Sequence, residues 1–163
     1  MGKSIILGAL ALFLFSCSQD KKVEVKNDTL VVFHAEKLPK LLNISQNAMD
    51  ILKDWPEYNA LETSFKALYN VKDNDGLSVV IEDLVEKQKL LEASTFPDKF
   101  DTPQVKSRLK VFKTYILKVK ANMGYGIETA IPLEEMVGAY NAMSDQFMVT
   151  VNNTLDTQQL LGE

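Results

Sequence analysis

Few side chains in this sequence are of the types that perform catalysis. Cys17 is the single cysteine and His34 the single histidine. One cysteine excludes an internal disulfide and a cysteine-based zinc site, and one histidine excludes a histidine-rich metal site. The usual general bases and nucleophiles are therefore almost exhausted. No nucleophile elbow, zinc-binding helix, phosphate loop or dinucleotide fingerprint occurs either, so we expect a protein that is not an enzyme.

One stretch has the end of a calcium-loop pattern. Asp73 and Asp75 alternate before a glycine, and Glu82 follows six residues after that glycine. Calcium loops need such carboxylates, a glycine for the sharp turn and a late bidentate glutamate. The first ligand position falls on Val71, which has no side-chain oxygen, and a turn followed by a capped helix explains the same residues. We therefore expect no metal ion at this weak calcium-like pattern.

The methionines suggest a second kind of site, because cores of helical bundles can hold haem or copper on His and Met ligands. The sequence offers His34 together with Met49, Met123, Met136, Met143 and Met148. The covalent haem motif of two cysteines and a histidine is absent, and methionine commonly fills gaps in cores without any ligand role. We expect no cofactor, and a small-ligand, haem or metal-binding bundle stays as the alternative function.

Basic residues are concentrated in one segment. Between Thr102 and Glu128 there are six basic residues and no acidic one. At about 100° per residue, four of them form a stripe beside the apolar face of a helix: Lys106, Lys110, Lys113 and Lys120. Such a stripe is typical of a surface for lipid phosphates or for a partner. The last 43 residues, 121–163, carry six acidic residues and no basic one, so charge complementarity between adjacent helices is the favoured interpretation.

Aromatic residues near predicted loops are the remaining candidates for a contact surface, because exposed Trp and Tyr are enriched at binding hot spots. Trp55 precedes a proline, and Tyr125 stands between two glycines. Trp55 has the alternative of packing at the proline kink, with Phe96 and Phe100 closing the end of the bundle. Tyr125 is the residue of this group that we most expect to be exposed.

These candidates must be positioned by helices. After residue 34 the apolar residues recur at the helical period. We expect a helix over 38–70 that is kinked or broken at Pro56, a helix capped by Asp75, a helix from Pro103 to about Met123, and a last helix from Pro132 to about Leu160. Four helical stretches joined by short loops favour antiparallel neighbours. The predicted fold is an all-α, up-down bundle of four main helices.

Antiparallel order also predicts what each end of the bundle holds. The segment before the first helix, the 96–102 loop and the C-terminus should gather at one end. The turns at 72–76 and 124–131 should lie at the other.

Overall composition agrees with one folded domain. The chain has 163 residues, of which 46% are hydrophobic and 25% charged, and a net charge of −4. This is the composition of an ordinary globular protein, and a chain of this size buries roughly 68–70% of its unfolded surface. Nucleic-acid-binding domains are strongly basic, so we expect no nucleic-acid partner.

The first residues have the pattern of an export signal. A basic start at Lys3 is followed by an apolar run over 5–15, which is too short for the roughly 20 residues that span a bilayer. The sequence Leu14-Phe15-Ser16-Cys17 then resembles the lipobox of bacterial lipoproteins, although Phe15 is bulkier than the commonest residue there. The resemblance implies cleavage before Cys17 and lipid modification of that cysteine. A signal that is uncleaved, or cleaved conventionally, is the alternative.

The lipobox resemblance divides the chain into a signal peptide at 1–16, a lipidated cysteine and linker at 17–34, and a helical domain at 35–163. Ser18 after the cysteine implies sorting to the outer membrane of the cell envelope, and the membrane is then a partner through the anchor. In that arrangement the end of the bundle nearest the linker, which we expect to include the 96–102 loop, faces the membrane.

A second resemblance covers residues 95–156. The sequences Phe-Pro-Asp-Lys-Phe-Asp at 96–101 and Val-Asn-Asn-Thr-Leu-Asp at 151–156 are similar to those of small helical-bundle lipoproteins of Bacteroidota. The resemblance implies an envelope location and a bundle, and it carries no activity or site. The expected function is a non-enzymatic binding module whose partner is an unknown envelope protein or glycan.

Overall fold

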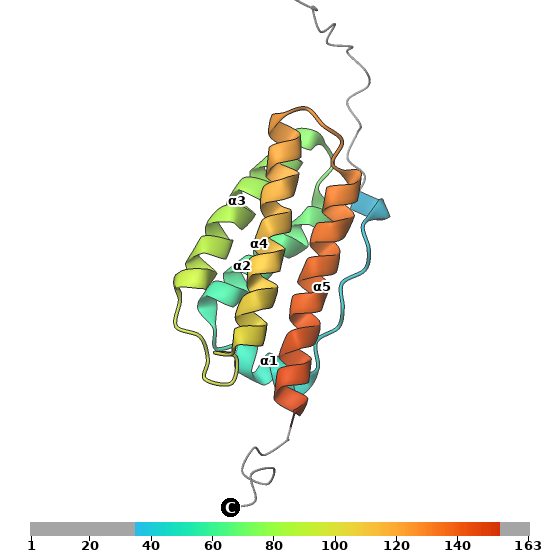
Figure 1. Cartoon of the computed structure of the whole chain (residues 1–163). Coiled ribbons are helices and arrows are strands. Elements are labelled where there is room, and N and C mark those ends of the chain that lie inside the picture. The colour runs from blue at the N-terminus through green and yellow to red at the C-terminus, as the bar shows by residue number, and fades with distance from the viewer. Residues whose placement is uncertain (1–34, 154–163) are drawn as a thin grey trace, which may run out of the picture.

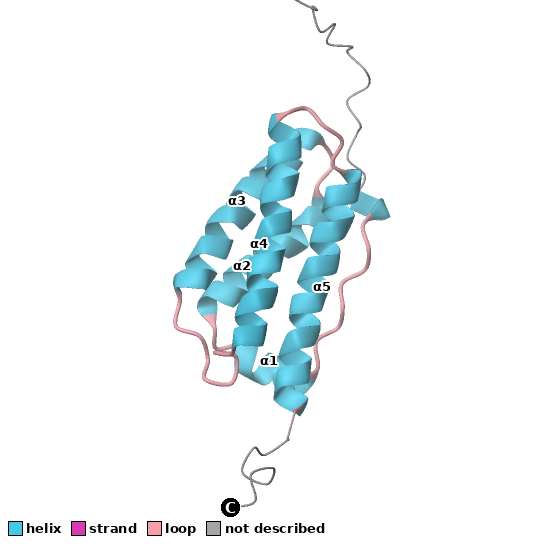
Figure 2. Ribbon diagram, in the orientation of Figure 1, coloured by secondary structure: helices cyan, strands magenta, loops and turns pink. Residues whose placement is uncertain are grey.

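The computed structural model describes residues 35–153, and within that range the chain is all-helical without a strand, which confirms the all-α class (Figures 1 and 2). Five α-helices and two short 3-10 helices make up this part of the chain. Their bounds are η2 Ala35–Lys37, α1 Gln46–Leu52, α2 Pro56–Ala67, η3 Leu68–Asn70, α3 Asn74–Ala93, α4 Pro103–Gly124 and α5 Ala130–Asn152.

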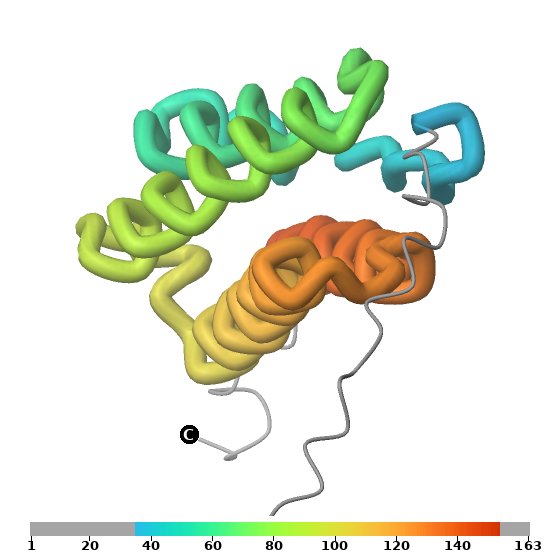
Figure 3. The backbone as a smooth tube through the Cα atoms, turned by 90° about the horizontal axis from the view of Figure 1, so that it is seen from above, coloured from blue at the N-terminus to red at the C-terminus, as the bar shows by residue number. Residues whose placement is uncertain are grey.

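The long helices pack in chain order. α2 packs on α3, α3 on α4 and α4 on α5. Figure 3 shows the α2–α3 pair on one side of the molecule and the α4–α5 pair on the other. In the part of the chain that is described, no helix is both long enough and apolar enough to cross a bilayer.

Pro56 splits the first predicted helix instead of kinking it. α1 ends at Leu52, and α2 starts at Pro56 with Trp55 as its N-cap residue. Proline is well tolerated as the first residue of a helix, where its missing N–H has no partner to lose. The sequence left both outcomes open, and the structure has two helices.

Residues 38–45 are extended rather than helical, so the prediction of a helix from residue 38 is wrong. This segment, which we call the strap, runs along α5 (Figure 1). The Asn141 side chain holds it by accepting a hydrogen bond from the Leu42 N–H at 2.9 Å and donating one to the Lys40 carbonyl at 3.0 Å. Tyr69 Oη donates to the Pro39 carbonyl at 2.6 Å. Side chains of distant helices thus satisfy backbone groups that a helix would have satisfied internally.

The strap reverses the expected position of the start of the domain. Because it crosses the length of the bundle before α1, residue 35 lies at the end that holds the loop 125–129 (Figure 1). Contact between η2 and η3 agrees with this placement. The 94–102 loop and the end of α5 lie at the opposite end, as expected, whereas η2 at the start of the described range does not.

Local signals set the ends of the other helices. Thr102 caps α4 by accepting from the Val105 N–H at 3.3 Å, as the sequence predicts. α3 is capped by Asp73, which accepts from the Gly76 N–H at 2.8 Å, so the assignment of Asp75 as the cap is wrong. α5 begins at Ala130, two residues before Pro132, and ends at Asn152 rather than near Leu160.

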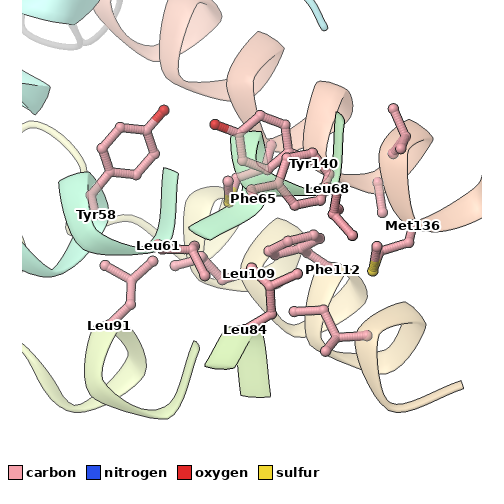
Figure 4. Packing of buried hydrophobic residues seen from close by; sticks show 14 of the residues in the cluster. Tyr58, Leu61, Phe65, Leu68, Leu84, Leu91, Leu109, Phe112, Met136 and Tyr140 are labelled. Atoms are coloured by element: carbon pink, nitrogen blue, oxygen red, sulfur yellow. The ribbon is translucent and has the colours of Figure 1, made fainter. Parts of the chain in front are cut away.

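The core is built from apolar side chains of all the long helices (Figure 4). Phe65 of α2 stacks on Tyr140 of α5 with ring centroids 4.0 Å apart, and Phe112 of α4 meets Phe65 edge-on at 5.4 Å. These rings fill the space between helices that are not neighbours in the chain. Aromatic pairs of this geometry add about 0.5–1.5 kcal/mol beyond the burial of their area.

Candidate functional site

A cavity of about 590 Å³ lies at the end of the bundle where the described range begins. We call it the end cavity. The start of α3, the last turns of α4 and the loop 125–129 enclose it. Its apolar lining is Leu77, Ile81, Met123 and Ile127. This volume lies in the range of about 300–1,000 Å³ that is usual for small-molecule sites.

The loop that walls the end cavity is held in place by backbone geometry. Gly126 has a φ of 64°, a left-handed conformation that glycine adopts without strain. The turn it makes lets the Ile127 N–H donate to the Asn122 carbonyl at 2.8 Å. The Asn122 side chain donates in turn to the Glu128 carbonyl at 2.8 Å. These hydrogen bonds hold the loop against the last turn of α4, and Ile127 forms part of the cavity lining.

The charged side chains of the lining are mostly acidic. Asp75, Glu82 and Glu128 contribute three carboxylates, and Lys120 contributes the single ammonium group. Lys120 Nζ lies 2.6 Å from Glu82 Oε2, so this pair is neutralised within the wall. Asp75 and Glu128 take part in no ion pair among residues 35–153. The cavity thus joins an apolar lining to two uncompensated carboxylates.

The calcium-like residues are not brought together as ligands. Asp73 caps α3, and Glu82 is paired with Lys120. Within the described range, no group of three or more His, Cys, Asp and Glu side chains is arranged to hold a metal ion. In this structure Asp73 acts as the cap of α3, and Glu82 acts as the partner of Lys120.

Three lysines of the predicted stripe pair with carboxylates of the same chain. Lys113 Nζ lies 2.5 Å from Glu92 Oε2, Lys120 pairs with Glu82, and Lys106 pairs with Asp101. Lys110 makes no ion pair within the described part. The partners lie mainly on α3 and the loop before α4, whereas the sequence pointed to the last helix. Among the ion pairs within residues 35–153, the one that reaches α5 is made by Lys118, outside the stripe, at 2.5 Å from Glu135.

Trp55 does not offer the exposed contact surface for which it was a candidate, because only 2% of it is exposed. Its Nε1 donates to Ser94 Oγ at 2.9 Å, and its ring lies 4.8 Å from that of Phe96. Phe100 is fully buried against Phe147 at 4.7 Å. These rings close the end of the bundle opposite the end cavity, and we call them the aromatic plug: Trp55, Phe96, Phe100 and Phe147.

Tyr125 is 80% exposed, as its flanking glycines indicated. The sequence analysis missed two neighbours, Ile127 at 56% and Ile131 at 64% exposed. We call these three residues the tip. Ile127 lies between the glycine turn and α5, and that position was the signal that marked it. Ile131 lies in the first turn of α5, outside the buried stripe of that helix.

Two buried tyrosines lie near the middle of the bundle. The hydroxyls of Tyr58 and Tyr140 point toward one another (Figure 4), and neither has a hydrogen-bond partner in the described structure. Burial raises the pKa of both phenols above the ordinary value of 10.0. Both groups are therefore neutral at physiological pH, and the negative charge of the nearby Glu62 further disfavours their ionisation.

The methionines are distributed through the fold instead of facing one site. Met136 and Met143 are fully buried in the core, and Met123 lines the end cavity. Met148 Sδ accepts a hydrogen bond from the Ser45 N–H at 3.3 Å, which helps to hold the strap. His34 and Cys17 lie outside the described residues.

A second hollow of about 580 Å³ lies beside the aromatic plug. Trp55 and Phe96 supply its aromatic lining, and both rings already pack against one another. It therefore has less free apolar surface for a ligand than the end cavity has.

Comparison with known proteins gives no match to a protein-family model, a curated protein or a solved structure.

Proposed function

We propose that the chain is a lipid-anchored protein of the cell envelope, held on the outer membrane through Cys17, whose helical domain is a non-enzymatic binding module. In this proposal the domain is an up-down bundle of α2 to α5, to which the strap and α1 are added. The export signal and lipobox pattern of residues 1–17 support the anchor. Two or more acyl chains give stable membrane attachment, whereas one gives only marginal binding.

The observation that carries the binding function is the end cavity, which combines volume, apolar lining and uncompensated charge in one place. Leu77, Ile81 and Met123 provide a surface for an apolar group. Asp75 and Glu128 provide carboxylates at the same hollow. The positive end of the α3 dipole, which would favour an anion, is already occupied by the Asp73 side chain.

The ligand class that fits is an organic cation with an apolar body. A few polar groups at a mainly apolar hollow fix the orientation of a ligand, while the apolar area supplies most of the affinity. An ammonium or guanidinium group would pair with Asp75 or Glu128, and its carbon chain would cover Ile81 and Met123. A basic side chain of an envelope protein beside apolar residues has the same chemistry.

The anchor is tested by intact mass spectrometry of protein extracted from native membranes, beside the Cys17→Ser variant. We expect the wild type to lose residues 1–16 and to gain the mass of acyl chains, and the variant to be unlipidated. A wild-type chain that carries no acyl mass would overturn the anchoring proposal.

The ligand class is tested with octylamine, octanol and octanoate, which share one apolar chain and differ in charge. Binding is followed in the full chain carrying Cys17→Ser, through the methyl resonances of Met123 and Ile127. We expect octylamine to bind most tightly and octanoate least. The double change Asp75→Asn with Glu128→Gln should remove the preference for octylamine over octanol.

Asp98→Asn, on an exposed residue of the opposite end, is the matched control and should leave that preference unchanged. Octanoate binding as tight as octylamine binding would overturn the ligand class. Shifts at the aromatic plug in place of the cavity methyls would move the site to the hollow beside Trp55.

The second candidate is a bundle that binds haem or a metal. The sulfur-bearing side chain of Met123 in the lining of the end cavity is the observation in its favour. An absorption spectrum and elemental analysis of the natively extracted protein decide it, because haem or a stoichiometric metal would appear in one of the two.

A further inference from the structure

The tip exposes three large apolar side chains at the edge of the end cavity. Tyr125, Ile127 and Ile131 lie within seven residues of each other, and each is more than half exposed. Large apolar side chains that gather on the surface mark contact sites for proteins or membranes. Tyrosine in particular is enriched where membrane and water meet, because its ring is apolar and its hydroxyl is polar.

The tip lies at the end where the chain enters the domain. Residue 35 is beside the loop 125–129 end of the bundle (Figure 1), and 18 residues, 17–34, separate the start of the domain from the end of the export signal. At most about 3.3–3.6 Å per residue, they reach roughly 60 Å. The linker therefore joins the domain at the end that carries the tip, and the aromatic plug lies farther from this junction by the length of the bundle.

The charges around the tip indicate which part of a membrane it suits. Glu128 lies within the tip segment and Glu134 follows it by one turn, and both are exposed. Carboxylates at this place disfavour attraction to anionic lipid headgroups. The apolar side chains of the tip suit shallow insertion at the membrane interface, with Glu128 and Glu134 left in contact with water, and such contact should depend little on salt.

We propose that the tip inserts into the lipid surface that carries the anchor, so that the domain stands with the end cavity toward the membrane and the aromatic plug away from it. This inference rests on the proposed lipid anchor. It reverses the orientation that the sequence suggested, in which the 96–102 loop faced the membrane.

Site-directed nitroxide labelling of the lipidated chain tests the orientation. When the sulfur of Cys17 is blocked by its lipid, Tyr125→Cys supplies the single free thiol for the label. The lipidated protein is placed in phosphatidylcholine vesicles, and collisions of the label with oxygen and with a water-soluble nickel chelate are compared. Lys99→Cys, on an exposed residue of the loop at the opposite end, is the matched control.

We expect the ratio of oxygen to nickel collisions to be several-fold higher at position 125 than at position 99. The ratio at 125 should stay the same between low and high salt. Adding Ile127→Glu and Ile131→Glu should lower it to the value at 99, while circular dichroism shows an unchanged fold.

Equal ratios at 125 and 99 in protein whose mass includes the acyl chains would overturn the inference and leave the anchor standing. Protein without acyl mass would overturn both. Spin–spin broadening at 125 would show that two tips meet in a dimer, and a ratio that falls with salt would show contact with charged headgroups. Either result would also overturn the insertion of the tip.

Discussion

The two ends of the bundle use their apolar residues in opposite ways. At one end the aromatic plug buries large rings against each other, with a hydrogen bond from Trp55 to Ser94. At the other end a glycine turn holds a cavity open, and Tyr125 remains 80% exposed. Both ends are rich in apolar side chains. Those of the plug pack against each other, whereas those of the tip stay largely exposed.

The difference separates stability from binding along the axis of the molecule. Side chains that pack fully contribute to the free energy of folding and have no surface left for a partner. Side chains around a cavity contribute less to folding and keep surface free, which is the usual condition of a binding site. The plug is thus the end where substitutions should cost stability, and the cavity end is the one where they should change contacts.

Truncation of plug residues is the strongest test of this contrast. Trp55→Ala and Phe100→Ala should each lower the free energy of unfolding by about 3–5 kcal/mol, because each leaves a large cavity in the core. Tyr125→Ala should change it by no more than about 0.5 kcal/mol, since the side chain is exposed. Urea unfolding of the three variants measures this. Equal losses at the two ends would break the contrast.

Alkaline unfolding shows how far the tightly packed region extends into the bundle. Burial raises the pKa of Tyr58 and Tyr140 above the ordinary value, so the folded state keeps both phenols neutral while the unfolded state ionises. Their stabilising effect is complete below pH 10 and is lost as pH rises above it. Each should remove about 1.4 kcal/mol of stability per pH unit from about pH 10 upward.

The measurement is the free energy of unfolding at several values between pH 9 and about pH 11, near the ordinary tyrosine pKa of about 10. Tyr140→Phe should reduce the slope above pH 10 by about 1.4 kcal/mol per pH unit, leaving the contributions of Tyr58 and Tyr69. It should cost little at neutral pH, because the hydroxyl it removes is buried without a hydrogen-bond partner. A slope unaffected by the substitution would mean that these phenols reach solvent.

Two helix caps give a matched comparison of the ends. Asp73 caps α3 beside the end cavity, and Thr102 caps α4 beside the aromatic plug. Each change to alanine should cost about 1 kcal/mol. If the cavity end opens locally, Asp73→Ala should speed amide exchange mainly in the first turn of α3. Thr102→Ala should speed amide exchange only through global unfolding. The opposite pattern would mean that the plug end, and not the cavity end, opens locally.

The ion pairs along α4 should contribute least. Glu92→Gln and Glu82→Gln each remove the partner of a half-exposed lysine, and the expected cost is about 0–1 kcal/mol apiece. Unfolding in low and in high salt measures it. Were a freed lysine responsible for membrane contact, these variants would bind anionic vesicles more tightly than the wild type, and we expect no such increase.

Much of the fold could be predicted where the signal was local. The start of α4 follows from Thr102 and Pro103, and its end from Gly124, because capping and helix termination depend on residues within one turn. The strap could not be predicted, since Leu41 and Ile44 have a spacing that suits a helix. The contacts that hold the segment extended come from distant residues: Asn141 and Met148, about a hundred residues farther along the chain, and Tyr69.

The same reasoning applies to the candidate site. The exposure of Tyr125 could be expected from the glycines beside it. The end cavity could not, because its walls come from α3, α4 and the loop after α4, and a volume between three elements has no signature in any one of them. The domain start was predicted at the wrong end of the bundle because the strap was missed. The strap crosses the length of the bundle once before α1 and so moves residue 35 to the other end.

The strap also determines how the domain responds to force. A pull on residues before Ala35 acts along the axis of the strap, parallel to α5 (Figure 1). The contacts at Pro39, Lys40, Leu42 and Ser45 then bear the load in shear, all at once. A strap peeled sideways would lose them one after another. The geometry is that of a mechanical clamp, which isolates the helices from tension applied to the N-terminal side of the chain.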